Sequence, residues 1–63
     1  MERIVDIIKD GVRIIQHQIT DYTGNWTVWI EYKNVTKIYH FNNKVIIYYN
    51  ADYKDNIEHI IEL

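Results

Sequence analysis

The chain has 63 residues, a formal net charge of −2, and neither cysteine nor proline. A chain this short buries only about 60% of its unfolded surface, so a single domain over residues 1–63 is expected to be marginally stable as a monomer. The absence of thiols excludes disulfides and thiolate metal sites, which leaves oligomerisation as the remaining reinforcement. The net charge gives no overall attraction to nucleic acid.

Residues Glu2–Asp10 predict a short helix, because the apolar residues at positions 4, 5, 7 and 8 share one side of a helix and Gly11 can end it. The alternative is a fifth strand that turns at Asp10-Gly11, a strong hairpin dipeptide. The β-branched content favours the strand. Strict alternation opposes it, because it would mix charged and apolar residues on one face.

Four strands are predicted in the middle of the chain. They are rich in β-branched and aromatic residues, and the segments between them contain Asp, Asn and Gly, which favour turns. Two-residue turns are expected at Lys33-Asn34 and Asn42-Asn43, which gives an antiparallel meander. The strands are Val12–Thr20, Trp26–Tyr32, Val35–Phe41 and Lys44–Tyr49.

The last segment predicts an amphipathic helix. Its apolar residues follow a spacing of i, i+4, i+7 and i+8, and Asn50 or Asp52 can cap its beginning. The expected fold class is therefore α+β: a small antiparallel four-stranded meander sheet with a short N-terminal helix and the C-terminal helix on one face. The apolar positions are Tyr53, Ile57, Ile60 and Ile61.

Both faces of the predicted sheet are apolar. With the turns given above, the core face carries Ile15, Ile19, Trp26, Val28, Ile30, Tyr32, Val35, Tyr39, Phe41, Ile46 and Tyr48. The opposite face carries the candidate partner-binding residues Trp29, Ile38, His40, Ile47 and Tyr49. An apolar surface with a polar rim indicates an interaction site, and Trp and Tyr are frequent binding anchors. A one-residue change in any turn would exchange the faces of a strand.

The residues that catalysis requires do not form a recognisable set. The histidines at 17, 40 and 59 lie in no ligand motif, serine is absent, and the two glycines are isolated. We therefore expect neither an enzyme nor a bound cofactor or metal.

The expected function is a protein-binding module that forms a homodimer or larger oligomer, binds a host protein, or does both. The excess of Ile, Asn, Tyr and Lys corresponds to AT-rich codons, which suggests a phage or mobile-element accessory protein that inhibits a host or defence protein by occupying a surface. No stretch is apolar enough to span a membrane and no signal peptide is evident, so the host cytoplasm is the expected location.

The alternative function is binding of single-stranded nucleic acid by residues 32–49. Lys33, Lys37 and Lys44 alternate there with aromatic side chains, an arrangement that suits stacked bases. Three lysines give only weak, salt-sensitive affinity, so nucleic acid ranks below a protein partner.

Overall fold

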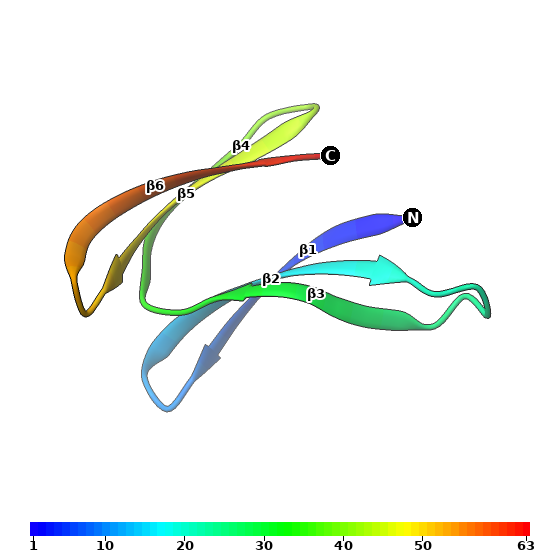
Figure 1. Ribbon diagram of the computed structural model, residues 1–63, viewed down its shortest axis with the longest axis horizontal. Helices are drawn as coiled ribbons and strands as arrows, with labels where there is room; N and C mark the ends of the chain where they lie inside the picture. Colours follow the sequence, from blue (N-terminus) through cyan, green and yellow to red (C-terminus); the bar gives the residue numbers. More distant parts are fainter.

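The computed structural model describes all 63 residues, and it is all-β. Sheet A contains β1 (Glu2–Lys9), β2 (Val12–Thr20) and β3 (Trp26–Tyr32), and sheet B contains β4 (Val35–His40), β5 (Lys44–Ala51) and β6 (Lys54–Glu62). Each sheet is antiparallel, and the two sheets face each other as layers (Figure 1). The expected α+β class is therefore wrong. The structure offers no helix that could cross a membrane.

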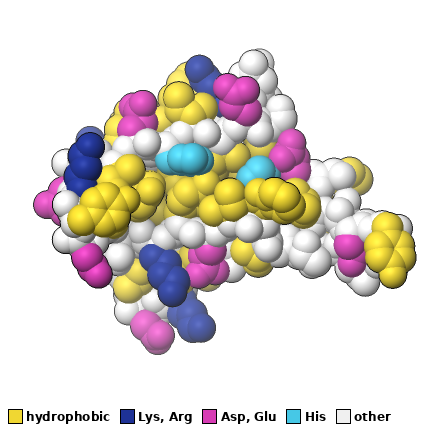
Figure 2. All heavy atoms as spheres, viewed as in Figure 1, with side chains coloured by type: hydrophobic (Ala, Val, Ile, Leu, Met, Phe, Trp, Pro, Cys, Tyr) yellow, Lys and Arg dark blue, Asp and Glu magenta, His cyan; other side chains and the backbone are white.

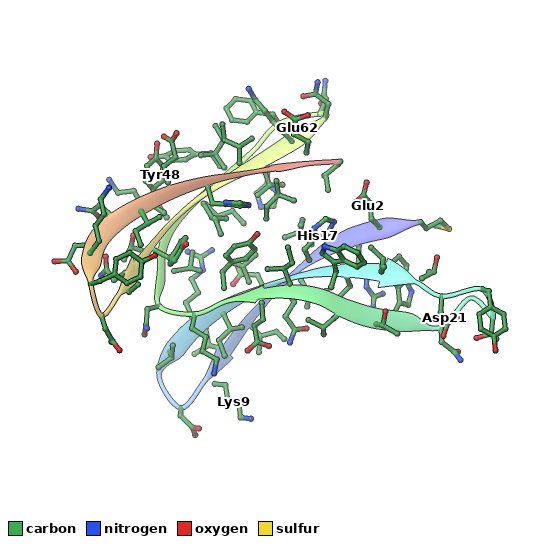
Figure 3. All side chains as sticks on the ribbon, viewed as in Figure 1. Glu2, Lys9, His17, Asp21, Tyr48 and Glu62 are labelled. Carbon is green, nitrogen blue, oxygen red and sulfur yellow. The ribbon has the colours of Figure 1, made fainter.

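The N-terminal segment is a strand because its charged residues find partners across the hairpin. The Asp10-Gly11 turn has φ values of 53° and 75°, the left-handed pair that a tight hairpin needs. The guanidinium of Arg13 donates to the Asp6 carboxylate at 2.5 and 3.1 Å. Nε2 of His17 lies 2.7 Å from a carboxylate oxygen of Glu2 (Figure 3). Alternation of charged and apolar residues is thus compatible with this strand.

The C-terminal segment is also a strand, which corrects the predicted helix. A spacing of four places Ile57 and Ile61 on the same side of a strand as well as of a helix, so this spacing did not separate the two structures. Strand β6 pairs along β5, which would otherwise be an apolar edge. The Asn50 side chain accepts a hydrogen bond from the backbone N–H of Asn56 at 2.9 Å, within this hairpin.

The predicted meander breaks between β3 and β4. At Lys33-Asn34 the chain leaves sheet A and enters sheet B, with Asn34 in the left-handed conformation at φ 59°. The expected pairing of β3 with β4 is therefore wrong. The hairpin between β4 and β5 has the expected register, with Tyr39 opposite Ile46. In the hairpin between β2 and β3 the register differs from the expected one, and a bulge interrupts it after His17.

The core lies between the two sheets. Its six buried residues are Ile15, Tyr32, Val35, Val45, Ile47 and Ile61. Only seven residues of the chain are buried, and the accessible surface is 4736 Å², against about 4,300 Å² expected for a folded chain of this mass. The sandwich is therefore open, with much apolar surface left uncovered.

A bulge between Val35 and Lys37 exchanges the predicted faces of β5 and of β4 beyond Val35. Ile47 was expected on the open face and is completely buried, whereas Tyr39 and Phe41 were expected in the core and are about half exposed, at 49% and 52%. In sheet A, Val28 and Ile30 were also predicted as core and are exposed. The general expectation that both faces are apolar is confirmed. The predicted core positions of Ile15, Tyr32 and Val35 are also confirmed, whereas the faces of β5 and of β4 beyond Val35 are the reverse of those predicted.

Truncation of a completely buried side chain tests this core. We expect Ile47→Ala to lower stability by about 2–5 kcal/mol because it removes buried methyl groups and leaves a cavity. Ile8→Ala is the matched control, since Ile8 is 75% exposed. Urea unfolding followed by circular dichroism should show a large shift of midpoint for the first variant only. Equal shifts in both would contradict the assigned core.

Acid unfolding tests the Asp6–Arg13 pair. Asp6 accepts a hydrogen bond from Arg13, which lowers the pKa of Asp6 below its ordinary value of 3.8. The positive charges of Arg13 and His40 lower this pKa further. The contribution of the Asp6–Arg13 pair to the free energy of unfolding is therefore present above pH 3.8 and is lost as the pH falls through the lowered pKa. Because the two side chains are 42% and 35% exposed, it should stay below about 1 kcal/mol. As the pH is lowered, the urea midpoint should fall more steeply in the parent protein than in Asp6→Asn. Equal slopes would contradict a stabilising role of the pair.

Candidate functional site

The outer face of sheet B carries exposed apolar side chains that form ordered rows across its three strands. Val45 and Ile47 of β5 are in the core, so the alternate residues of that strand point away from sheet A. Figure 3 shows Tyr48 and Glu62 on this outer side. We call this surface the outer patch; it consists of Lys37, Tyr39, Phe41, Lys44, Ile46, Tyr48, Glu58, Ile60 and Glu62.

The strand register arranges the outer patch in three rows that run from β4 across β5 to β6. The rows are Lys37, Tyr48 and Glu58; then Tyr39, Ile46 and Ile60; then Phe41, Lys44 and Glu62. The middle row is apolar apart from one phenolic hydroxyl. In the rows on either side, the lysines lie on β4 and β5 and both glutamates lie on β6. The patch therefore has an apolar centre and a charge that changes sign across it.

The aromatic side chains of the outer patch are held by contacts with one another and with lysine. The rings of Tyr39 and Tyr48 meet edge to face, with centroids 6.1 Å apart. The Lys44 ammonium lies 5.5 Å from the centre of the Phe41 ring. Despite these contacts, Tyr39, Phe41 and Ile60 remain 49%, 52% and 44% exposed. Rigid, exposed aromatic groups of this kind provide contact area at low entropic cost on binding.

One hydrogen bond joins the central strand of the patch to its acidic edge. The Tyr48 hydroxyl donates to one carboxylate oxygen of Glu58 at 2.5 Å. This bond raises the pKa of Tyr48, because it stabilises the protonated phenol; burial and the negative charge of Glu58 act in the same direction. Only one oxygen of Glu58 takes part, so the other can accept a bond from a partner.

The structure does not bring the five residues of the predicted partner site together. Trp29 lies on β3 of sheet A and is 64% exposed. The other four, Ile38, His40, Ile47 and Tyr49, lie on the face of sheet B that looks toward sheet A. Ile47 is completely buried there, and Ile38 and Tyr49 pack against the core, so an intact fold offers little of these three to a partner.

The residues that the sequence reasoning missed as a site are those it assigned to the core. Tyr39, Phe41, Ile46 and Tyr48 were grouped correctly on one face, but that face is the outer one. The signal that could have identified it is the charge at both margins: Lys37 and the acidic residues of β6 would be costly in a core.

A second apolar surface follows the opening between the sheets. Figure 2 shows a hydrophobic band there with histidine side chains on it. Trp29 and Ile30 are exposed members of β3, and the ring of His59 lies 5.1 Å from that of Tyr32 across the gap. No group of three or more His, Cys, Asp or Glu side chains is placed to hold a metal ion. The Glu2–His17 pair lies on the same side of sheet A as this band.

Comparisons with protein-family models, with curated proteins and with solved structures found no match.

Titration of the tyrosines tests the bond at the acidic edge. Glu58→Gln should lower the pKa of Tyr48 toward that of an ordinary tyrosine, because the neutral amide no longer opposes formation of the phenolate. Absorbance at the phenolate band during alkaline titration measures this change. Glu62→Gln, four residues further along β6 and without a hydrogen bond to Tyr48, should leave the titration unchanged. Identical curves for the Glu58 variant and the parent would contradict the bond.

Proposed function

We propose that the protein is a non-catalytic protein-binding module that binds through the outer patch. The observation that carries the proposal is the exposure of Tyr39, Phe41 and Ile60 on a sheet whose other face is already the core. Sheet A covers one side of sheet B and leaves the apolar outer side open to a partner. Apolar surface with a charged margin suits a protein surface of the same kind.

The charges of the patch favour a protein over nucleic acid. Tyr39 and Phe41 could stack on bases, and Lys37 and Lys44 could contact phosphates, as the single-strand alternative requires. Glu58 and Glu62 lie on the same face and would repel those phosphates. The charge of the patch sums to zero, which a protein partner with mixed charges can match.

The proposed setting follows from the composition. We place the protein in the cytoplasm as an accessory protein of a phage or mobile element, where occupying the surface of a host or defence protein would be enough to inhibit it. No chemical step is needed for this mode of action, because a bound patch excludes the natural partners of that surface.

Site-specific photo-crosslinking tests the proposal. A photo-reactive phenylalanine analogue replaces Tyr39 in the patch or, as the control, Tyr22 in the loop between β2 and β3, which is fully exposed. The cells that naturally produce the protein are irradiated, and adducts are identified by mass spectrometry. We expect a discrete protein adduct from position 39, either with the same chain or with another, and none from position 22.

The absence of any protein adduct from position 39 would contradict the proposal. Equal adducts from both positions would mean that the patch is no different from other exposed surface. An adduct with nucleic acid from position 39 would transfer the function to the single-strand alternative.

A further inference from the structure

We infer that the partner of the outer patch is a second copy of this chain, related by a two-fold axis that runs parallel to the strands. This inference rests on the proposed function and names the occupant of the same site. It comes from the charge pattern of the patch, which is complementary to itself in one orientation and not in the other.

A two-fold axis along β5 brings β4 of one copy opposite β6 of the other while keeping each row in place. The sheets would then stack face to face about 10 Å apart. Lys37 of each copy meets Glu58 of the other, because both belong to the same row. Tyr39 meets Ile60 in the apolar row, and Ile46 meets its own counterpart on the axis.

The third row completes the complementarity. The Lys44 ammonium does not extend straight out from β5 but lies over the Phe41 ring, 5.5 Å from its centre, on the β4 side of the patch. The same rotation brings Glu62 of the other copy over that ring. Each ammonium of the patch therefore meets a carboxylate, and the dimer contains four such pairs.

The alternative axis, perpendicular to the strands, is disfavoured by the same charges. It would bring β4 opposite β4 and β6 opposite β6 with the rows reversed. Lys37 would then lie against the row of Lys44, and Glu58 against Glu62. Like charges that face each other across an interface oppose association. The pattern thus selects one geometry as well as one partner.

The hydrogen bond between Tyr48 and Glu58 prepares the patch for this contact. The bond fixes one carboxylate oxygen of Glu58 at 2.5 Å from the hydroxyl and leaves the other free for Lys37 of the second copy. The nine side chains are fewer than the about 20–30 residues per side of a standard interface, so the dimer should be weak, with a micromolar dissociation constant.

Charge exchange tests the geometry. Sedimentation equilibrium at concentrations up to about 500 μM should show a monomer–dimer equilibrium for the parent protein. Lys37→Glu alone and Glu58→Lys alone should each weaken dimerisation by at least about tenfold, because both charge pairs become repulsive. An equimolar mixture of the two variants should form a heterodimer, since one copy then presents only negative and the other only positive charge in this row.

The controls separate the geometry from general effects of charge and folding. Lys9→Glu makes the same change of charge at an exposed site of sheet A and should leave dimerisation unchanged. Circular dichroism of each variant confirms that the exposed substitutions preserve the sheets. Recovery of association in the mixture would show that the weakening in each single variant does not come from damaged folding, because a misfolded chain would not regain its partner.

The outcomes distinguish this inference from the proposed function. A parent protein that stays monomeric throughout, or a dimer that ignores both charge reversals, would overturn the inference. If the crosslinker at position 39 then captures a different protein, the proposed function stands and only the identity of the partner is wrong. The absence of any protein adduct at position 39 would contradict both the dimer and the proposed function.

Discussion

The structure depends on one strand that is apolar on both faces. Strand β5 places Val45 and Ile47 on one side and Ile46 and Tyr48 on the other, and it is the central strand of sheet B. The backbone of β5 is hydrogen-bonded to β4 and β6. What is left to cover is therefore the apolar side chains on its two faces. Sheet A covers only one of these faces. The open sandwich and the outer patch both follow from this imbalance.

The crossing between the sheets and the bulge in β4 together decide which face of sheet B is covered. The sequence patterns predicted the four middle strands, the hairpin between β4 and β5, and the presence of two apolar faces. They did not predict that the chain would change sheets at Lys33-Asn34, because a short connection with Asn is also a good hairpin turn. Nor did they predict the bulge between Val35 and Lys37, which reverses the faces beyond Val35, so that Ile47 lies in the core and Tyr39 at the surface.

The helical predictions at both ends failed for a different reason. In each case the apolar spacing was compatible with a helix and a strand, and pairing decided the outcome. Cross-strand bonds from Arg13 to Asp6 and from Tyr48 to Glu58 could not be anticipated without the register. Of the predicted site residues, only Trp29 and His40 keep an exposed side chain, and they lie in different sheets. The sequence predicted an apolar aromatic surface with a polar rim, but it did not predict which face of sheet B is exposed.

The most direct test of this account is an isotope-filtered NMR measurement of contacts between labelled and unlabelled copies in a mixed sample. The account predicts intermolecular contacts between the Ile46 methyl groups of the two copies, and between the ring of Tyr39 and the methyl groups of Ile60. Intermolecular contacts found only around Trp29, in the band between the sheets, or only on a face of sheet A would show that the copies associate through another surface. That result would contradict the role assigned to the outer patch.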